Sequence, residues 1–310
     1  MPRRTDEEQA DFHRALDSLA DEGPLTTAQL DALSVLEGGD LDAFRRVWEG
    51  LSAPARARLI RGLRGAAEER LRLDFSPVNQ LALDDPDEQV RLAGVECALE
   101  DRSPRLLSRL VELVRGDPSV NVRRSAAEDL ARFALLGELD DLDPDATRRV
   151  RERLLEVVHA QEEDPSVRAS ALAALGYFSD EAIMHELADA FIDSLLRLGA
   201  VRGMGRSADP RWTDRLMPVL GSEDPQMREE AARALGEIED ERAVSPLVEL
   251  VDDQVPAVRL AAIEALGTIG GEEAREALLY ALEDADPQIR QAAEKAIGDL
   301  EERENDPLDL

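Results

Sequence analysis

The chain has one cysteine, one lysine and few aromatic residues. Cys97 is the sole thiol, which rules out an internal disulfide and fits a reducing compartment. Aromatic residues make up 3% of the 310 positions while apolar residues make up 43%, so the core must be built from Leu, Ala and Val. This composition favours helices.

Long apolar runs are also missing. No stretch approaches the length of a membrane span, and the two arginines near the N-terminus are followed by no apolar segment. Acidic residues outnumber basic ones by 68 to 37, and such a surface repels phosphate backbones and anionic lipid heads. We therefore expect a soluble, cytoplasmic protein with no nucleic-acid or membrane partner.

What the chain does have is an internal repeat. Its template is an apolar residue and Arg, then small residues four and seven places after the first, then an apolar residue and Gly. One copy consists of Val258, Arg259, Ala262, Ala265, Leu266 and Gly267. Strong copies also begin at Val167, Met227 and Ile289, and weaker ones at Val90, Val122 and Leu196. The last three intervals between these starts are all 31 residues, which does not arise by accident.

Each copy predicts one helix of a helical hairpin. The template positions fall on one face of a helix, and a second periodic run follows each terminal glycine. The glycine itself, Gly267 in the copy above, suits the left-handed residue that stops a helix. Proline starts helices well, and Asp-Pro precedes five template helices, at 85–86, 117–118, 164–165, 224–225 and 286–287. Because one hairpin buries too little to fold alone, the hairpins must stack on one another.

The Asp-Pro turn, the Val-Arg pair and the Ala-Ala-Leu-Gly ending resemble the HEAT and HEAT-like repeats, in the short variety found in phycobilisome lyases. The resemblance covers about residues 80–300, in seven copies. It implies an all-α fold, an α-solenoid in which about seven stacked hairpins form a right-handed superhelix. We expect a helical cap over residues 1–80, the repeat array over 81–300 and an acidic tail over 301–310.

The resemblance also implies a role for the recurring arginine, because in such repeats this Arg and an Asp six residues earlier form a ladder of hydrogen bonds between neighbours. The pairs here are Asp85 and Arg91, Asp117 and Arg123, Asp253 and Arg259, and Asp284 and Arg290, with Glu162 before Arg168. Arg197 and Arg228 follow Phe191 and Ser222 instead, so they need another acid. An anion-binding stripe is the alternative, but stacking already requires such regular placement.

Some segments depart from the template. An insertion predicts a long helix from Pro144 to His159. Gly203 and Gly205 could belong to a phosphate loop, but the preceding strand and the lysine of such a loop are missing, so close helix packing is favoured. Trp212 either packs between repeats or anchors a partner.

The N-terminal 80 residues do not match the template. Residues 26–29 fit a capping box at the start of a helix. We expect this helix to end at Gly38-Gly39. Two further helices are expected to begin near Asp40 and Ser52. The segment also holds a basic island, which we expect to contact the acidic body of the same chain or, alternatively, an acidic partner. It consists of Arg45, Arg46, Arg56, Arg58, Arg61, Arg64, Arg70 and Arg72.

No catalytic constellation is visible in the sequence. A di-iron site of the deoxyhypusine hydroxylase kind needs repeated His-Glu pairs, and only His185-Glu186 occurs. DNA glycosylases of this architecture need a basic face with aromatic residues, which the composition opposes. We therefore expect no enzyme activity, no catalytic residue, no cofactor and no metal.

The remaining candidate is a protein-binding surface. In such solenoids the second helix of each repeat lines the concave side, and several of its outward positions are apolar here. The candidate residues are Leu92, Val95, Leu172, Leu198, Val201, Arg202, Trp212, Leu260 and Ile263. We expect a monomeric, non-catalytic scaffold that binds a protein or peptide along this face, with acidic edges favouring basic partners. The alternative, by analogy with the family, is a lyase or chaperone for a cofactor-bearing protein such as a bilin protein.

Overall fold

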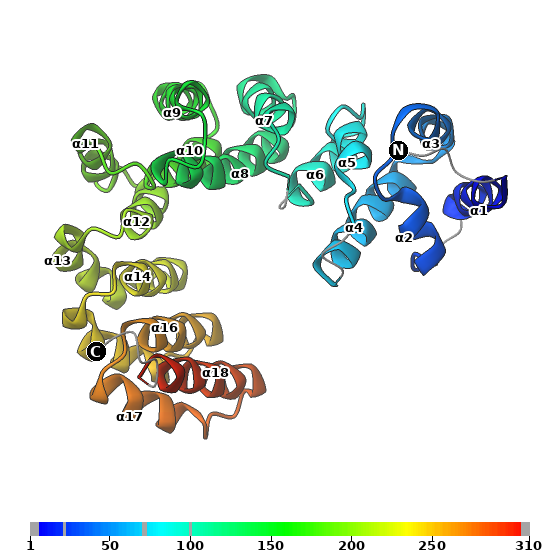
Figure 1. The fold of residues 1–310 in the computed structure, drawn as a ribbon. Coiled ribbons are helices and arrows are strands. Elements are labelled where there is room, and N and C mark those ends of the chain that lie inside the picture. Colours follow the sequence, from blue (N-terminus) through cyan, green and yellow to red (C-terminus); the bar gives the residue numbers. More distant parts are fainter. Residues whose placement is uncertain (1–5, 21–22, 70–72, 99–100, 305–310) are drawn as a thin grey trace. The chain divides into compact units, whose positions relative to one another are not determined.

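The computed structural model describes residues 6–20, 23–69, 73–98 and 101–304, and helices are the only regular secondary structure in these ranges (Figure 1). The all-α fold expected from the sequence is confirmed. The chain divides into two compact units, residues 1–133 and 134–310, and the division falls within one long helix, α8.

The first unit begins with helices that do not follow the repeat template. Its elements are α1 (Asp6–Asp17), η1 (Ser18–Ala20), α2 (Thr27–Leu33), α3 (Gly38–Gly50), α4 (Ala53–Glu69), α5 (Ser76–Leu83), α6 (Glu88–Glu96), α7 (Pro104–Gly116) and the start of α8 (Val120–Glu138). Phe12, Phe44 and Trp48 lie in one apolar cluster that continues through α4 and α5 to α6. The N-terminal helices thereby share a core with the first hairpin.

The second unit is a stack of hairpins. Its α-helices are α9 (Pro144–His159), α10 (Pro165–Leu175), α11 (Glu181–Ala190), α12 (Arg197–Arg206), α13 (Thr213–Leu216), α14 (Pro225–Ile238), α15 (Val244–Glu249), α16 (Pro256–Ile269), α17 (Glu272–Ala281) and α18 (Pro287–Glu304). Short 3-10 segments extend α13 and α15: η2 (Pro210–Trp212), η3 (Met217–Gly221), η4 (Glu241–Ala243) and η5 (Leu250–Asp252). The template helices α10, α12, α14, α16 and α18 pack side by side in sequence order, and we call them the inner row (Figure 1). The helices α9, α11, α13, α15 and α17 form the outer row. This is the arrangement of an α-solenoid.

The Asp-Pro pairs start inner-row helices for a local reason. Asp164 and Asp224 are the N-cap residues of α10 and α14, and their carboxylates accept backbone hydrogen bonds from Ser166 and Gln226, each at 2.9 Å. The prolines that follow occupy the first helical position, where no amide hydrogen is needed. At α10 and α14 the sequence and the cap geometry therefore agree, whereas the N-cap of α6 is Asp87, two residues after Asp85.

The template glycines serve close packing between inner-row helices. A Cβ added at Gly236 would lie 2.9 Å from the Cα of Ala265 on the next helix, closer than real Cβ contacts allow. The prediction that Gly267 stops its helix is wrong, because α16 continues to Ile269. The positive φ angles are at Gly270 (79°) and Gly271 (91°). The same contact recurs between Gly176 and Gly203, Gly205 and Ala234, and Gly267 and Ala296.

Four further local predictions have clear outcomes. Thr26 and Gln29 form the expected capping box at the start of α2, and α9 runs from Pro144 to His159 as predicted. The second helix ends at Leu33 and not at Gly38, because Gly38-Gly39 form the first residues of α3. Helix α18 continues to Glu304, so the start of the predicted tail is helical, and residues 305–310 lie outside the described ranges.

Candidate functional site

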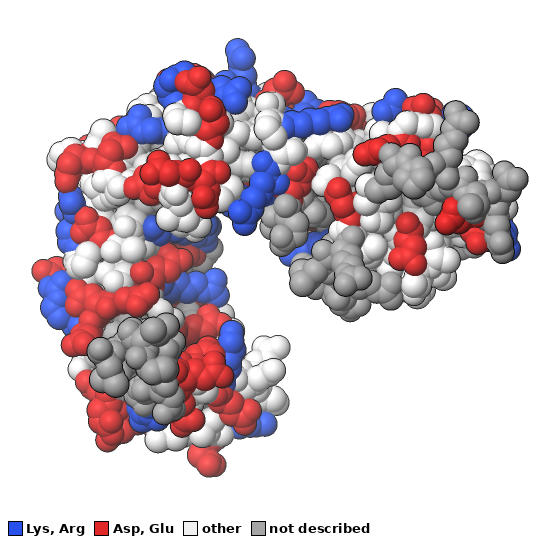
Figure 2. Space-filling view, viewed as in Figure 1, with Lys and Arg blue, Asp and Glu red and all other residues white. Residues whose placement is uncertain are grey.

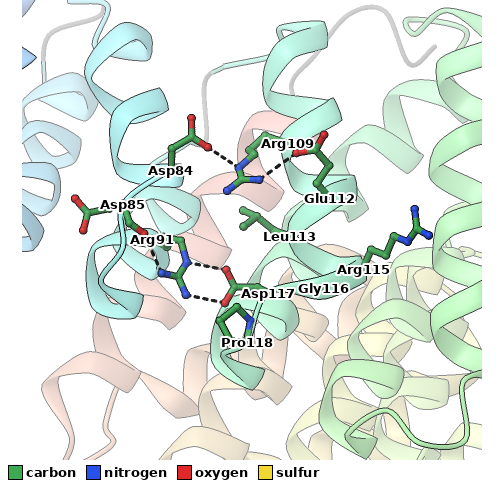
Figure 3. A pocket seen from close by; sticks show the side chains of 10 residues that line it. All are labelled: Asp84, Asp85, Arg91, Arg109, Glu112, Leu113, Arg115, Gly116, Asp117 and Pro118. Atoms are coloured by element: carbon green, nitrogen blue, oxygen red, sulfur yellow. Dashed lines mark hydrogen bonds and ion pairs between the residues drawn. The ribbon is translucent and has the colours of Figure 1, made fainter.

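The recurring arginines bridge neighbouring repeats. Arg91 donates from Nε and Nη2 to the two carboxylate oxygens of Asp117 in the following repeat, at 2.7 and 2.9 Å (Figure 3). Its Nη1 donates to the backbone carbonyl of Asp85, six residues earlier, at 2.9 Å. Each Asp of the ladder therefore binds two arginines. Its backbone carbonyl accepts from the Arg of its own repeat, and its carboxylate accepts from the Arg of the preceding repeat.

The same rungs occur in the second unit. Arg228 donates to both carboxylate oxygens of Asp253 at 2.8 and 3.0 Å, which is the other acid that this arginine needed. Arg259 pairs with Asp284 at 3.0 Å and donates to the carbonyl of Asp253. At the last repeat, Arg290 donates to the carbonyl of Asp284 at 2.7 Å.

The ladder begins on α4, two helices before the first template helix, α6. Arg56, on α4, lies 2.8 Å from the Asp85 carboxylate and donates to the carbonyl of Leu51 at 2.7 Å. Trp48 donates from its indole nitrogen to the same carboxylate at 3.2 Å. The sequence assigned Arg56 to the basic island, and the template gave no signal for its role, because Arg56 and Asp85 are 29 residues apart while Arg91 and Asp117 are 26 apart. Arg70 and Arg72 of that island lie outside the described residues.

Burial and ion pairing make the rungs strong. The side chains of Arg91 and Asp117 are 9% and 3% exposed, and the hydrogen bonds that Arg91 donates to Asp117 raise the pKa of its guanidinium. In the second unit, the hydrogen bonds from Arg228 lower the pKa of Asp253. A buried, bidentate pair fixes the spacing of two neighbours because either charge alone would be left without solvation.

A cavity of about 500 Å³ lies beside the rung between Arg91 and Asp117. Figure 3 shows that Arg109, across this cavity, lies between Asp84 and Glu112, with which it forms ion pairs at 2.9 and 3.0 Å. These side chains therefore neutralise one another, and the cavity is lined by the ion pairs that join the two repeats.

Two positions interrupt the ladder. Phe191 and Ser222 stand where the other repeats have Asp or, at position 162, Glu, so neither Arg168 nor Arg197 finds a carboxylate at the usual place. Arg168 is buried and donates to the carbonyl of Val158 at 2.9 Å. Arg197 is exposed, and its guanidinium lies 4.7 Å from the centre of the Phe191 ring.

The structure corrects the expected binding face, because five of its nine residues are in the core. Ile263 is 0% exposed and Trp212 is 5% exposed. Apolar positions that face the adjacent helix are covered by the next repeat and cannot contact a partner. The five are Val95, Leu172, Val201, Trp212 and Ile263. The other four, Leu92, Leu198, Arg202 and Leu260, are half-buried.

The half-buried residues of the second unit lie on the inner row. Arg202 on α12 donates to both carboxylate oxygens of Glu230 on α14, at 2.9 and 2.5 Å, so it links two helices. Leu260 lines a groove of about 870 Å³ between α16 and α18. The groove also contains Lys295, the sole lysine of the chain, and Glu264. Its lining combines apolar side chains with charges of both signs.

The described residues contain no group of three or more metal-ligating side chains of the His, Cys, Asp and Glu kind. His159 and Glu186, from neighbouring outer-row helices, contact each other at 3.1 Å.

No helix in the described part of the chain is long and apolar enough to span a membrane. Figure 2 shows acidic side chains, interspersed with arginines, over the visible faces of both units, as the net charge of −31 requires.

Residues 192–256 and 250–310 match the family model of HEAT repeats. Human deoxyhypusine hydroxylase in complex with glycerol is 18% identical, with 96% of this chain and 98% of that chain covered and a TM-score of 0.39. Yeast importin-beta (Kap95p) is 14% identical over 96% of this chain and 46% of its own length, with a TM-score of 0.48. An engineered protein is 25% identical over 63% of this chain and 98% of its own, with a TM-score of 0.40. No curated protein matches the sequence.

The repeat period, the stacked hairpins and the matched family model agree. The matched residues begin in the turn before α12 and include the inner-row helices α12, α14, α16 and α18. The rungs of Arg228 and Arg259 lie within the same range. Residues 192–310 of the chain consist of HEAT repeats.

Proposed function

We propose that this protein is a non-catalytic scaffold that binds another protein along the exposed side of the inner row. The observation that supports this most directly is the groove between α16 and α18, where Leu260 remains half-buried beside Lys295 and Glu264. Repeat arrays of this kind use such extended surfaces for binding.

The groove suits a partner segment with an apolar side chain and charges of both signs. Leu260 and Ala292 supply apolar contact, while Lys295 and Asp299 lie within reach of opposite charges on a ligand. Steering by the surrounding acidic surface favours a partner that is basic overall. Because the rungs hold neighbouring repeats at fixed spacing, the surface is preorganised and little entropy is lost on binding.

A photo-crosslinking amino acid at Thr268, in the groove, identifies the partner in the organism of origin, and the same amino acid at Glu276 on outer-row helix α17 is the control. Affinity is then measured by titration calorimetry with the purified partner. We expect Leu260→Arg to weaken binding about tenfold or more, which corresponds to about 1.4 kcal/mol. Leu279→Arg, at a 51% exposed position of α17, is expected to leave affinity unchanged.

Equal affinity of wild type and Leu260→Arg would contradict the proposed surface. Loss of binding in Leu279→Arg alone would place the partner on the outer row instead. Circular dichroism of both variants checks that helix content is retained, since neither position belongs to the core.

A further inference from the structure

One inner-row turn differs from the others. Residues 191–196, which we call the Phe191 turn, connect α11 to α12 at the place where other repeats carry a polar Asp-Pro turn. Ile192 is 84% exposed and Leu195 is 60% exposed. Exposed aliphatic side chains are common singly, but two in one short turn form an apolar point on a surface that is otherwise charged.

The turn is held in a defined conformation by hydrogen bonds to Asp193. The Asp193 carboxylate accepts a hydrogen bond from the backbone amide of Leu195 at 2.9 Å. The Asp193 carbonyl accepts two more, from the backbone amides of Leu196 at 3.1 Å and Arg197 at 2.8 Å. The two aliphatic side chains therefore project from an ordered support.

Two arginines flank the turn, and neither has an acidic partner among the described residues. The guanidinium carbons of Arg197 and Arg215 lie 4.7 and 5.6 Å from the centre of the Phe191 ring, and Arg215 also stacks on Trp212 at 5.5 Å. Within the described part of the chain, neither guanidinium forms an ion pair. The cause is the interrupted ladder, because Ser222 stands where the carboxylate for Arg197 would be. Two like charges are thus held close together by one aromatic ring.

We propose that the Phe191 turn is a docking site for an acidic, apolar segment of a partner protein. Ile192 and Leu195 are the apolar anchors, and Arg197 and Arg215 bind carboxylates beside them. Charge complementarity supports this occupant, since neither arginine forms an ion pair within the described residues and the Asp193 carboxylate of the turn is engaged by the backbone amide of Leu195. The Debye length at physiological salt is about 8 Å, so nearby charges dominate the interaction with a short segment. A lipid surface is disfavoured, because it would face the net charge of −31 over a much wider area. This site is separate from the inner-row groove and does not rest on the proposed function.

The test uses a phage-displayed library of random peptides selected on the full chain, with affinities of the selected peptides measured by fluorescence anisotropy. We expect enrichment of peptides that combine Asp or Glu with Leu, Ile or Phe. Binding of these peptides should weaken about tenfold or more in Ile192→Ser/Leu195→Ser and in Arg197→Glu/Arg215→Glu. The matched control Leu139→Ser/Leu279→Ser, which also removes two exposed aliphatic side chains, should bind like wild type.

A charge exchange makes the test independent of stability. A peptide in which Lys replaces every Asp and Glu should bind Arg197→Glu/Arg215→Glu better than it binds wild type. The proposal is overturned if no peptide is selected, if the selected peptides are basic, or if they bind the turn variants as well as wild type. It is also overturned if phosphatidylserine vesicles, or a second copy of the chain in sedimentation velocity, bind in a way that depends on Ile192 and Leu195. Leu260→Arg, the groove variant, is expected to keep peptide binding, so failure of one site does not imply failure of the other.

Discussion

Removal of the Asp117 carboxylate should strongly destabilise the first unit. In Asp117→Ala, Arg91 keeps the backbone carbonyls of Asp85 and Pro86 as acceptors for Nη1. Its Nε and Nη2 lose the carboxylate that they bind among the described residues, while the side chain is 9% exposed. Loss of one member of a buried ion pair destabilises a protein by about 3 to 5 kcal/mol. That is a large share of the roughly 5 to 15 kcal/mol that holds a typical domain folded.

The assay is urea unfolding followed by tryptophan fluorescence. Trp48 lies in the core of the first unit and Trp212 in the second, so Trp212→Phe leaves a signal from the first unit alone. We expect a clear fall of the unfolding midpoint for Asp117→Ala in this background. Arg91→Met/Asp117→Leu should recover part of the loss, because no buried charge is then left unpaired.

Asp11→Ala is the control for this prediction. Asp11 also lies in the first unit and pairs with an arginine, Arg14, but the two side chains are 60% and 76% exposed, and such pairs contribute about 0 to 1 kcal/mol. If Asp117→Ala changes the free energy of unfolding by no more than this control variant does, the argument that the rungs hold the repeats together is wrong.

Three other changes have expected outcomes. Gly236→Ala should destabilise the folded protein by about 1 to 3 kcal/mol in thermal unfolding, because the new Cβ meets Ala265. Gly298→Ala, whose Cβ would have no atom within 4 Å, should be neutral or stabilising. Equal effects of the two variants would contradict the packing role of Gly236. Arg56→Met should lower the melting temperature of the first unit, because the Asp85 carboxylate is 2% exposed and loses its ion pair; an unchanged midpoint would remove Arg56 from the ladder. Hydrogen bonds from Arg242 lower the pKa of Asp240 from 3.8 to about 2. Since the pKa is lower in the folded state, this stabilisation is present above pH 3.8 and is lost as the pH falls toward 2. Asp240→Asn should therefore lessen the acid sensitivity of unfolding in that window. An ordinary pKa for Asp240 in a carboxyl NMR titration would contradict this prediction.

The repeat architecture could be predicted because its signals are local. A helix of period 3.6 and an Asp-Pro start are written into consecutive residues, so α9 and the inner-row helices appear where the pattern placed them. The interrupted ladder at Phe191 was also visible as a missing Asp. Short-range patterns of this kind do not depend on the distance between repeats.

The candidate site was predicted less well because exposure depends on the neighbouring repeat. Leu260 and Ile263 lie less than one turn apart on α16, yet one is half-buried and the other is 0% exposed. The role of Gly267 was mispredicted for the same reason. This glycine packs against Ala296 on the next helix and does not end its own helix. Sequence spacing cannot give the rotation of one helix against the next, which decides both outcomes.

Hydrogen–deuterium exchange of the full chain, alone and with its purified partner, tests the central proposal most directly. The exposed side of the inner row is proposed to bind the partner, so exchange should slow in α16 and α18 while the outer-row helices α15 and α17 exchange as in the free protein. Slower exchange confined to α15 and α17 would contradict the account.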